Sequence, residues 1–391
     1  MMAATEERGT GLDFSLTEGQ RAVRDLARRV AETDLRPAAM RHDETREFPF
    51  EVVRKLADLG FMGITWPQEL EGAGLTDLEA VLIVEELARV DPSVALTVAS
   101  HNSLCAGHIM LFGSEDQKRA CIPDLASGRR LGAWALTEPG SGSDSGAMKT
   151  TARRDGAGWI ISGTKAFITQ GSVASTYVVM AVTDPGRGKA GVSAFILEKG
   201  LPGFAVGRKE DKLGMRSSDT ASLVFQDVRV GADSLLGVPG EGFKQALRVL
   251  DGGRIGIAAL SVGIAQGALE ASLRYARERI QFGRPIAEFQ AIQWKLAEMA
   301  TDIEAARLLT HRAAWMKTRG EDVNLAGATA KYFASEAAVR AANEAVQIHG
   351  GYGFTREFPV EKLYRDVKLM TIGEGTSEVQ KMVIARNLLG R

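Results

Sequence analysis

The sequence has few cysteines, and this shortage limits what the protein can be. Its 391 residues include two cysteines, Cys105 and Cys121. Two are too few for a disulfide framework, and neither lies in a CxxC motif or in a metal-type cluster with the five histidines. We therefore expect both to be small buried hydrophobic residues in a reducing compartment, and we expect no metal site.

Net charge is also nearly absent. Lys and Arg number 48 and Asp and Glu 49, and no basic stretch is interleaved with aromatic residues, so we expect neither a nucleic-acid nor a membrane partner. A small-molecule partner is the default. No apolar run is expected to reach membrane length, and Met1 to Thr10 has charged residues and no apolar core of a signal peptide. A cytoplasmic protein is expected, or a matrix protein whose targeting segment has been removed.

The chain is too long for one ordinary core, and its first part is helical in pattern. This pattern extends from Leu16 to about Leu125. Thr17 and Gln20 have the spacing of a capping box. Asp77 is expected to cap a second helical run, which Pro92 ends.

The pattern then changes twice. Between about Gly132 and Gly240, short β-rich runs are separated by Gly, Pro and Asp: Trp159–Ile161, Tyr177–Val182, Val192–Leu197 and Ser222–Val230. After Gly242, apolar residues recur at helical steps, and the Ala-rich run Leu325–Ile348 suits a bundle or a subunit contact. The expected fold class is α+β, with an N-terminal helical domain (12–130), a middle β-barrel or sandwich domain (131–240) and a C-terminal helical bundle (241–391).

One segment near the C-terminus, Gly373-Glu374-Gly375-Thr376-Ser377, places a carboxylate between two glycines at a break between helical stretches. Such a break can expose a base to a bound substrate, and we therefore take Glu374 as the candidate catalytic base. Taken alone, Gly-Glu-Gly is more often a solvated turn, and the other segments of the chain favour the base. Thr376 or Ser377 is expected to cap the last helix.

Two earlier segments have the composition of a ligand site. In Leu136–Asp144, glycines allow close approach of the backbone, while N–H groups and hydroxyls can donate to anionic or carbonyl oxygens. A plain loop is the alternative. In Lys165–Thr169, Phe167 and Thr169 are expected to share one strand face, so a ring can pack on a flat cofactor while the hydroxyl bonds its edge. Core packing of the strand is the alternative.

Two later segments follow helices. In Arg277–Gly283, arginines at a helix end can pair with a diphosphate or complement the helix dipole. Gln347–Phe354 contains three glycines, more than a helix C-cap needs, so its backbone is expected to lie against something. His349 is expected to be structural, because no second ligand stands at helical spacing.

Taken together and in this order, the five segments resemble the acyl-CoA dehydrogenase family of flavoproteins, from about Phe14 to Leu389. Both signatures of that family are present, and two further stretches support the resemblance. The signatures and stretches are Ala135–Gly146, Gln347–Gly353 with Glu357 and Lys362–Asp366, Lys212–Asp219 and Gly240–Phe243.

The resemblance implies N-terminal helices, a middle β-domain and a C-terminal four-helix bundle, with FAD between the β-domain and the bundle. It assigns the catalytic base to Glu374. It implies cofactor contacts from Leu136, Thr137, Ser143, Phe167, Thr169, Arg279, Gln281, Phe282, Gln290, Gln347, Gly350, Gly351, Thr376 and Glu378, those of Arg279 to Gln290 and Gln347 to Gly351 largely from a neighbouring subunit. Substrate contacts are expected from Ser143, beside the CoA portion, and from Asp251, Arg254 and Gly375.

The implied reaction is α,β-dehydrogenation of an acyl-CoA to the trans-2-enoyl-CoA in fatty acid β-oxidation, with electrons passed to an electron-transfer flavoprotein. A homo-oligomer, a dimer of dimers, is expected. Two positions depart from the common family pattern. Phe167 stands where Trp is common, and Gly373 stands where Tyr is frequent, which widens the space beside the base. Gly253 occupies the position before Arg254 where some relatives carry their base, so that alternative base is absent.

A short acyl chain, linear or singly branched, is the expected substrate. Leu250–Ala258 and Ser100–Leu104 look most like the short-chain branch of the family. The resemblance places Ala95 where glutaryl-CoA dehydrogenases carry an arginine for the distal carboxylate of the substrate. Dicarboxylic substrates are therefore expected to be poor. Against the short-chain expectation, the wider space at Gly373 favours a bulkier or aromatic acyl group.

Two rival functions remain. One is a flavin oxidase or monooxygenase of the same fold, and Glu374 argues against a monooxygenase, which needs no such base. The other is a flavin-free scaffold, which the intact Arg279, Gln347 and Thr169 disfavour. If Glu374 is not the base, Glu138 is the next candidate.

Overall fold

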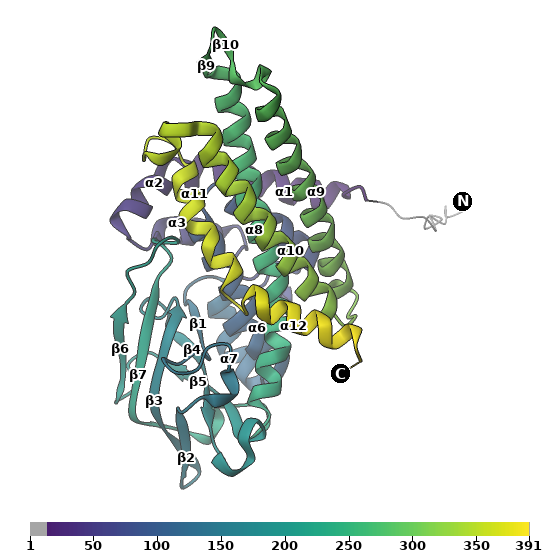
Figure 1. The fold of residues 1–391 in the computed structure, drawn as a ribbon. Coiled ribbons are helices and arrows are strands. Elements are labelled where there is room, and N and C mark those ends of the chain that lie inside the picture. Colours follow the sequence, from purple (N-terminus) through teal and green to yellow (C-terminus); the bar gives the residue numbers. More distant parts are fainter. Residues whose placement is uncertain (1–13, 391) are drawn as a thin grey trace, which may run out of the picture.

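Residues 14–390 are described by a computed structural model, in which a sheet lies along the sequence between two helical regions (Figure 1). This is the α+β fold class expected above. The expected domain boundaries near residues 130 and 240 remain predictions. The first ten residues, for which we expect no targeting segment, lie outside the described part.

The first region contains seven α-helices within the described residues. They are α1 (Glu18–Val30), α2 (Arg36–Thr45), α3 (Phe50–Asp58), α4 (Asp77–Ala88), α5 (Pro92–Ser100), α6 (Ala106–Phe112) and α7 (Glu115–Ala126). Two π-helical turns, η1 (Ala31–Leu35) and η3 (His101–Cys105), connect α1 to α2 and α5 to α6, and a short 3₁₀ turn, η2 (Gln68–Leu70), precedes α4.

The predicted capping box begins α1. The Thr17 hydroxyl accepts from the Gln20 N–H at 3.2 Å, and the Gln20 side chain accepts from the Thr17 N–H at 2.9 Å. The prediction for α4 was wrong by one residue. Its cap is Thr76, in a second capping box with Glu79, while Asp77 is the first helical residue, where a carboxylate suits the positive end of the helix dipole.

Pro92 starts a helix instead of ending one. The preceding helix, α4, already ends at Ala88, and Asp91 caps α5 by accepting from the Ser93 N–H at 3.1 Å. Proline suits this first helical position because it has no N–H to leave unpaired. The cysteine prediction holds for Cys105, which is fully buried, but Cys121 on α7 is only partly buried.

The middle region forms one eight-stranded sheet in the order β6-β7-β3-β2-β4-β5-β8, with β1 paired to β4. Its strands are β1 (Gly132–Ala135), β2 (Thr151–Asp155), β3 (Gly158–Thr169), β4 (Thr176–Val182), β5 (Val192–Glu198), β6 (Phe204–Lys209), β7 (Thr220–Val230) and β8 (Leu235–Leu236). The pairs β1–β4 and β2–β4 are parallel, and the others are antiparallel. All four predicted β-runs lie in strands of this sheet.

The last region is helical. It comprises α8 (Gly242–Glu278), a hairpin of β9 (Ile280–Gln281) and β10 (Arg284–Pro285), α9 (Gln290–Thr318), α10 (Asn324–His349), α11 (Val360–Val367) and α12 (Ser377–Leu388). In Figure 1, α8, α9 and α10 lie side by side, α12 lies near the lower ends of α9 and α10, and α8 extends further down. Gly263 and Gly267 let α8 approach α4 closely, because a Cβ at Gly263 would lie 2.7 Å from the Ala88 Cβ.

The expectation that no apolar run reaches membrane length was wrong for α8. This helix has 37 residues and contains an 18-residue window apolar enough to cross a membrane. Within the described structure, however, 83% of that window is buried. Its position at the centre of the bundle accounts for its composition.

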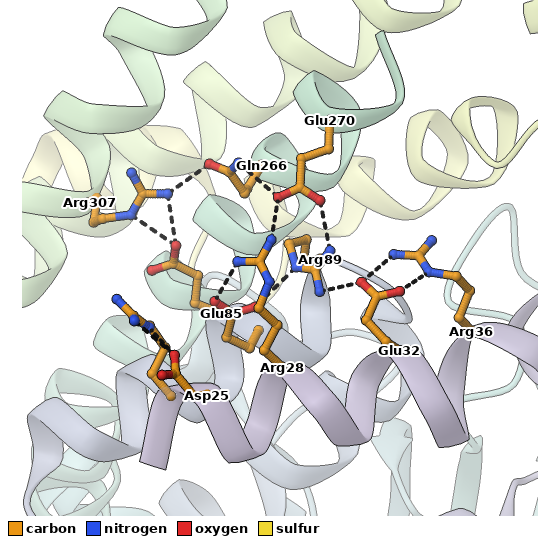
Figure 2. A network of polar contacts seen from close by, with 11 residues as sticks. Asp25, Arg28, Glu32, Arg36, Glu85, Arg89, Gln266, Glu270 and Arg307 are labelled. Carbon is orange, nitrogen blue, oxygen red and sulfur yellow. Dashed lines mark hydrogen bonds and ion pairs between the residues drawn. The ribbon is translucent and has the colours of Figure 1, made fainter. Parts of the chain in front are cut away.

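A buried ionic network joins the first helices to the bundle (Figure 2). Arg89, the C-cap residue of α4, donates to Glu86 at 3.0 Å, to Glu32 on the π-turn η1 at 2.6 Å and to Glu270 on α8 at 2.7 Å. The Arg89 side chain is only 2% exposed. A hydrogen bond from Arg36, together with Arg89, lowers the pKa of Glu32 to about 2, so this carboxylate stays charged. The network links η1, α4 and α8.

The second π-turn, η3, places a neutral histidine under the sheet. His101 accepts from the Gly132 N–H at Nδ1 (3.1 Å) and donates from Nε2 to the Leu125 carbonyl (3.0 Å). Burial lowers the pKa of His101 to about 4, so the ring is uncharged at neutral pH. These contacts tie η3 and α7 to β1.

Candidate functional site

Glu374 lies in a strained loop between η9 (Lys368–Thr371) and α12. Its backbone has φ = 53°, and Gly375 has φ = 95°. The left-handed conformation costs a non-glycine residue roughly 1–2 kcal/mol, so the surroundings must hold this loop. Thr376 caps α12 as predicted, its hydroxyl accepting from the Val379 N–H at 3.3 Å.

The Glu374 carboxylate points at α8 and has no partner. The residue is partly exposed, yet its Oε2 is closed off from solvent and accepts no hydrogen bond from the described residues. Gly253 provides the room, because a Cβ at Gly253 would overlap Oε2 and lie 3.2 Å from Cδ of Glu374 and 3.4 Å from Cδ2 of Leu104. Burial raises the pKa of Glu374 to about 7, against the opposing charges of Lys331 and Arg254. Such a carboxyl group can act as a base near neutral pH.

Two of the predicted substrate residues lie beside this carboxylate. Arg254 donates to Asp251 Oδ1 at 2.8 Å, and Asn324 donates to the same oxygen at 2.8 Å. Burial lowers the pKa of Arg254 and raises that of Asp251. The Nε of Arg254 is buried and has no partner in the described chain, which leaves a donor free in the site.

A buried lysine shapes the loop after β1. Lys165 Nζ donates to the Leu136 carbonyl and to Glu138 Oε1, both at 2.9 Å, and Lys165 is fully buried. Glu138 also accepts from the N–H groups of Lys149 (2.6 Å) and Thr150 (2.9 Å). Burial alone would raise the pKa of Glu138, but Lys165 lowers it. Both Glu138 carboxylate oxygens already accept hydrogen bonds, and the lowered pKa makes the group a weak base. Glu138 is therefore unsuited to be the alternative catalytic base considered above.

The same loop contacts the end of β3. The Ala166 N–H donates to the Thr137 carbonyl at 2.9 Å. Phe167 has φ = 55° within a β-bulge that the sequence did not predict, and it is 65% exposed. Ile168 is buried and Thr169 is partly exposed, and the bulge interrupts the regular strand alternation from which a shared face of Phe167 and Thr169 was expected. Leu136, Thr137, Phe167 and Thr169 are thus brought together, with Ser143 exposed on the same loop.

A second group of predicted cofactor residues lies at the other end of α8. Arg279, Gln281, Gly350 and Gly351 line a cavity of about 500 Å³. The Arg279 guanidinium lies 5.3 Å from the centre of the Tyr352 ring and forms no ion pair with any described residue. Near it, Phe282 is 93% exposed, Gln290 begins α9 and Gln347 is exposed on α10. His349 stacks on Tyr275 and bonds the Ala345 carbonyl, consistent with a structural role.

One chain does not bring the two groups together. Figure 1 shows the β9–β10 hairpin at the end of the bundle opposite the sheet. Along α8, roughly 39 Å separates Gly253 from Arg279 at 1.5 Å per residue, which exceeds the reach of a single dinucleotide cofactor. The predicted contribution of these residues to a neighbour's cofactor is compatible with this separation and remains a prediction.

Three family models cover nearly all of the chain. They are the acyl-CoA dehydrogenase N-terminal domain at residues 17–129, the middle domain at 133–228 and the C-terminal domain at 240–389. The chain therefore belongs to the acyl-CoA dehydrogenase family. It is an oxidoreductase and an FAD-dependent flavoprotein of that family, as the sequence predicted.

Relatives and solved structures agree with this assignment. The short-chain specific acyl-CoA dehydrogenase of Clostridium acetobutylicum is 46% identical over 374 residues, covering 96% of this chain and 99% of the relative. The structure of butyryl-CoA dehydrogenase from Megasphaera elsdenii has a TM-score of 0.95 at 44% identity, covering 97% of this chain and all of the other. A chain in a structure on the electron transferring flavoprotein of Acidaminococcus fermentans has a TM-score of 0.96 at 47% identity, with coverage of 97% and 100%.

The residues present fit FAD. Arg279 is a cation without an ion pair among the described residues, which suits a diphosphate. At Gly350 and Gly351, and at Gly140 and Gly142 in the loop after β1, nothing lies within 4 Å of where a Cβ would be, so the backbone is open to a ligand. Beside the latter loop, the exposed Phe167 offers a ring face.

Some residues of this site were not found from the sequence. Lys331, Gln380 and Lys165 are buried polar side chains that bond the backbone of the loops named above. Their contacts span from 5 to 44 positions in the sequence. The only available signal was a charged residue in an otherwise apolar stretch, as at Lys331 in the Ala-rich helix.

Proposed function

We propose that this protein oxidises a short acyl-CoA, linear or singly branched, to the trans-2-enoyl-CoA, with Glu374 as the catalytic base. The observation that carries the proposal is the Glu374 carboxylate beside Gly253, whose buried Oε2 has no hydrogen-bond partner among the described residues and whose pKa is raised to about 7. A group in this state can take up the weakly acidic α-proton of a thioester at neutral pH.

The chain's own groups divide the work as follows. Glu374 receives the α-proton at its carboxylate. The N–H of Glu374 forms no hydrogen bond within the described chain and is placed to donate to the thioester carbonyl, which stabilises the negative charge that develops there. Leu136, Thr137, Phe167 and Thr169 would hold the ring system of FAD and orient it toward the acyl chain. Bound there, the cofactor would supply an acceptor for the β-hydrogen as hydride.

Within the same proposal, Ser143 and Gly375 lie along the substrate, with Asp251 and Arg254 behind the base. Thr376 and Glu378 complete the cofactor site. Arg279, Gln281, Phe282, Gln290, Gln347, Gly350 and Gly351 bind the diphosphate and adenosine of a neighbouring subunit's FAD, in a dimer of dimers. The separation of the two residue groups along α8 supports this sharing. Arg279→Ala is expected to weaken both FAD retention and subunit association, and a protein that is monomeric yet fully loaded with FAD would contradict it.

The short-chain assignment rests on the relatives, which include short-chain specific enzymes. Because each buried methylene contributes only about 0.8 kcal/mol, neighbouring chain lengths overlap. We expect kcat/KM to be highest for butyryl- or isovaleryl-CoA, and a maximum at octanoyl-CoA or longer would refute the assignment.

The decisive test is Glu374→Gln, which keeps the shape of the side chain and removes the base. Mixed anaerobically with butyryl-CoA, the variant should keep its FAD and bind substrate, while the rate of flavin bleaching falls about 100- to 10,000-fold. Bleaching at the wild-type rate would place the base elsewhere.

Electrons are proposed to pass to an electron-transfer flavoprotein. In the wild type, the reduced flavin with bound enoyl product should be reoxidised by this partner and only slowly by air. Rapid reoxidation by air would favour an oxidase of the same fold. A cytoplasmic location remains part of the proposal.

A further inference from the structure

Lys331 is a buried cation under the catalytic loop that the reaction above does not use. It lies on α10, is fully buried, and its Nζ donates to the Gly375 carbonyl at 2.6 Å. It forms no ion pair with any carboxylate of the described residues. A buried ammonium group without an ion pair is costly, so its one strong contact, to the residue after Glu374, needs explanation.

A second buried donor holds the same loop. Gln380 on α12 is fully buried, and its Nε2 donates to the carbonyls of Gly375 at 2.9 Å and Glu374 at 3.3 Å. The carbonyls of Glu374 and Gly375, the two residues with left-handed φ angles, therefore both accept hydrogen bonds from buried side chains. These bonds offset the strain of the loop, which would relax to an ordinary conformation if they were absent.

We propose that Lys331 is a positioning residue for proton abstraction: by holding the Gly375 carbonyl it keeps the Glu374 carboxylate over Gly253, and its charge keeps that carboxylate available as a base. The inference rests on the proposed function, because it requires Glu374 to be the base. Lys331 itself touches neither substrate nor cofactor in this assignment.

Charge is the second part of its role. The charged groups that surround Lys331 and Glu374 are Arg254 and Asp251 on α8, Glu336 on α10 and Glu378 on α12. Of the cations, Lys331 acts most strongly on Glu374, ahead of Arg254. Burial lowers the pKa of Lys331 to about 8, so it is cationic through the range in which Glu374 titrates. Removing this charge should leave Glu374 protonated up to a higher pH.

The test compares Lys331→Met, which removes donor and charge, with Lys331→Arg, which keeps both in altered geometry. Lys368→Met, at an exposed lysine on η9, is the matched control. Flavin reduction by saturating butyryl-CoA is followed anaerobically against pH. For Lys331→Met we expect the maximal rate to fall about 10- to 100-fold and the midpoint of the pH profile to rise by about one unit, with little change in substrate affinity. Lys331→Arg should restore the midpoint.

A second measurement, which does not depend on turnover, follows the protonation of Glu374 directly. The carboxyl infrared band that disappears in Glu374→Gln is titrated in substrate-free holoenzyme, and its midpoint should rise in Lys331→Met. A merely structural lysine would lower thermal stability or FAD content and leave both midpoints unchanged, which would overturn the proposal. If Lys331→Met does not fold, Gln380→Leu and Lys331→Arg test the proposal instead. Gln380→Leu should slow flavin reduction without changing the midpoint of the pH profile. A raised midpoint in Lys331→Arg, which keeps the charge, would refute the role of charge. Failure of the proposed function is distinct, because wild type would then not be bleached.

Discussion

Burial of Glu374, the proposed base, should make the protein less stable than a variant without this carboxyl group. In the folded protein, burial raises the pKa of Glu374 from its ordinary 4.5 to about 7. Below about pH 4.5 the carboxyl group is protonated in both states and has no effect. Between pH 4.5 and 7 the folded protein holds a proton that the unfolded chain has lost, so the free energy of unfolding falls as pH rises.

The size of this effect follows from the pKa difference. A rise from 4.5 to about 7 corresponds to roughly 3 kcal/mol of folding free energy lost by about pH 7.5. Glu374→Gln is neutral at every pH and does not incur this loss. We therefore expect the variant to be more stable than wild type at about pH 7.5, and the two to converge near pH 5. The range ends below about pH 8, where Lys331 also titrates.

Thermal unfolding of the substrate-free holoenzymes, followed by circular dichroism across this pH range, measures the difference. Glu69→Gln is the matched control, because Glu69 is an exposed carboxylate with no ion pair in the described structure; its difference from wild type should be small at each pH. A Glu374→Gln protein that is less stable than wild type at pH 7.5, or a difference that does not change with pH, would refute the claim that burial sets the pKa of the base.

Three further outcomes are expected. Gly253→Ala should displace the Glu374 carboxylate and slow flavin reduction about 10- to 100-fold, whereas Gly256→Ala on the same helix, where the added Cβ has ordinary contacts, should stay near wild type. Lys165→Met should loosen the loop after β1 and lower the flavin-to-protein absorbance ratio of the purified protein; an unchanged ratio would show that this loop does not depend on the lysine. Arg89→Met removes the buried centre of the ionic network, so that its carboxylates keep only Arg28 and Arg36 as cationic partners among the described residues; it should lower the free energy of unfolding by about 3 kcal/mol, measured by urea denaturation, with no effect on flavin bleaching per bound FAD.

Local patterns predicted the elements and the exposed site residues. Neighbouring residues determine the helix cap at Thr17, the β-rich runs and the Gly-Glu-Gly break at Glu374. A short stretch of sequence is therefore enough to predict them. The cap of α4 was misplaced by one residue because Thr76 and Asp77 both suit an N-cap, and only the contact with Glu79 decides between them.

The interior of the site could not be predicted in this way. The contact of Lys331 with Gly375, and the space that Gly253 leaves for Glu374, join segments that are distant in the sequence and depend on how α8, α10 and α12 pack. The π-turns η1 and η3 likewise have no local sequence signal, since each arises where helices adjust to reach partners elsewhere.

The shared volume at Gly253 and Glu374 also limits how such a site can change over generations. A side chain gained at position 253 while Glu374 is present meets the carboxylate, and a loss of Glu374 while position 253 is glycine leaves no base. Each single substitution is therefore harmful alone, although the two together can restore a base at the other position. This is sign epistasis with a steric cause, and it predicts that lineages with the base on α8 and lineages with the base on the loop are separated by a step in which both positions changed nearly together.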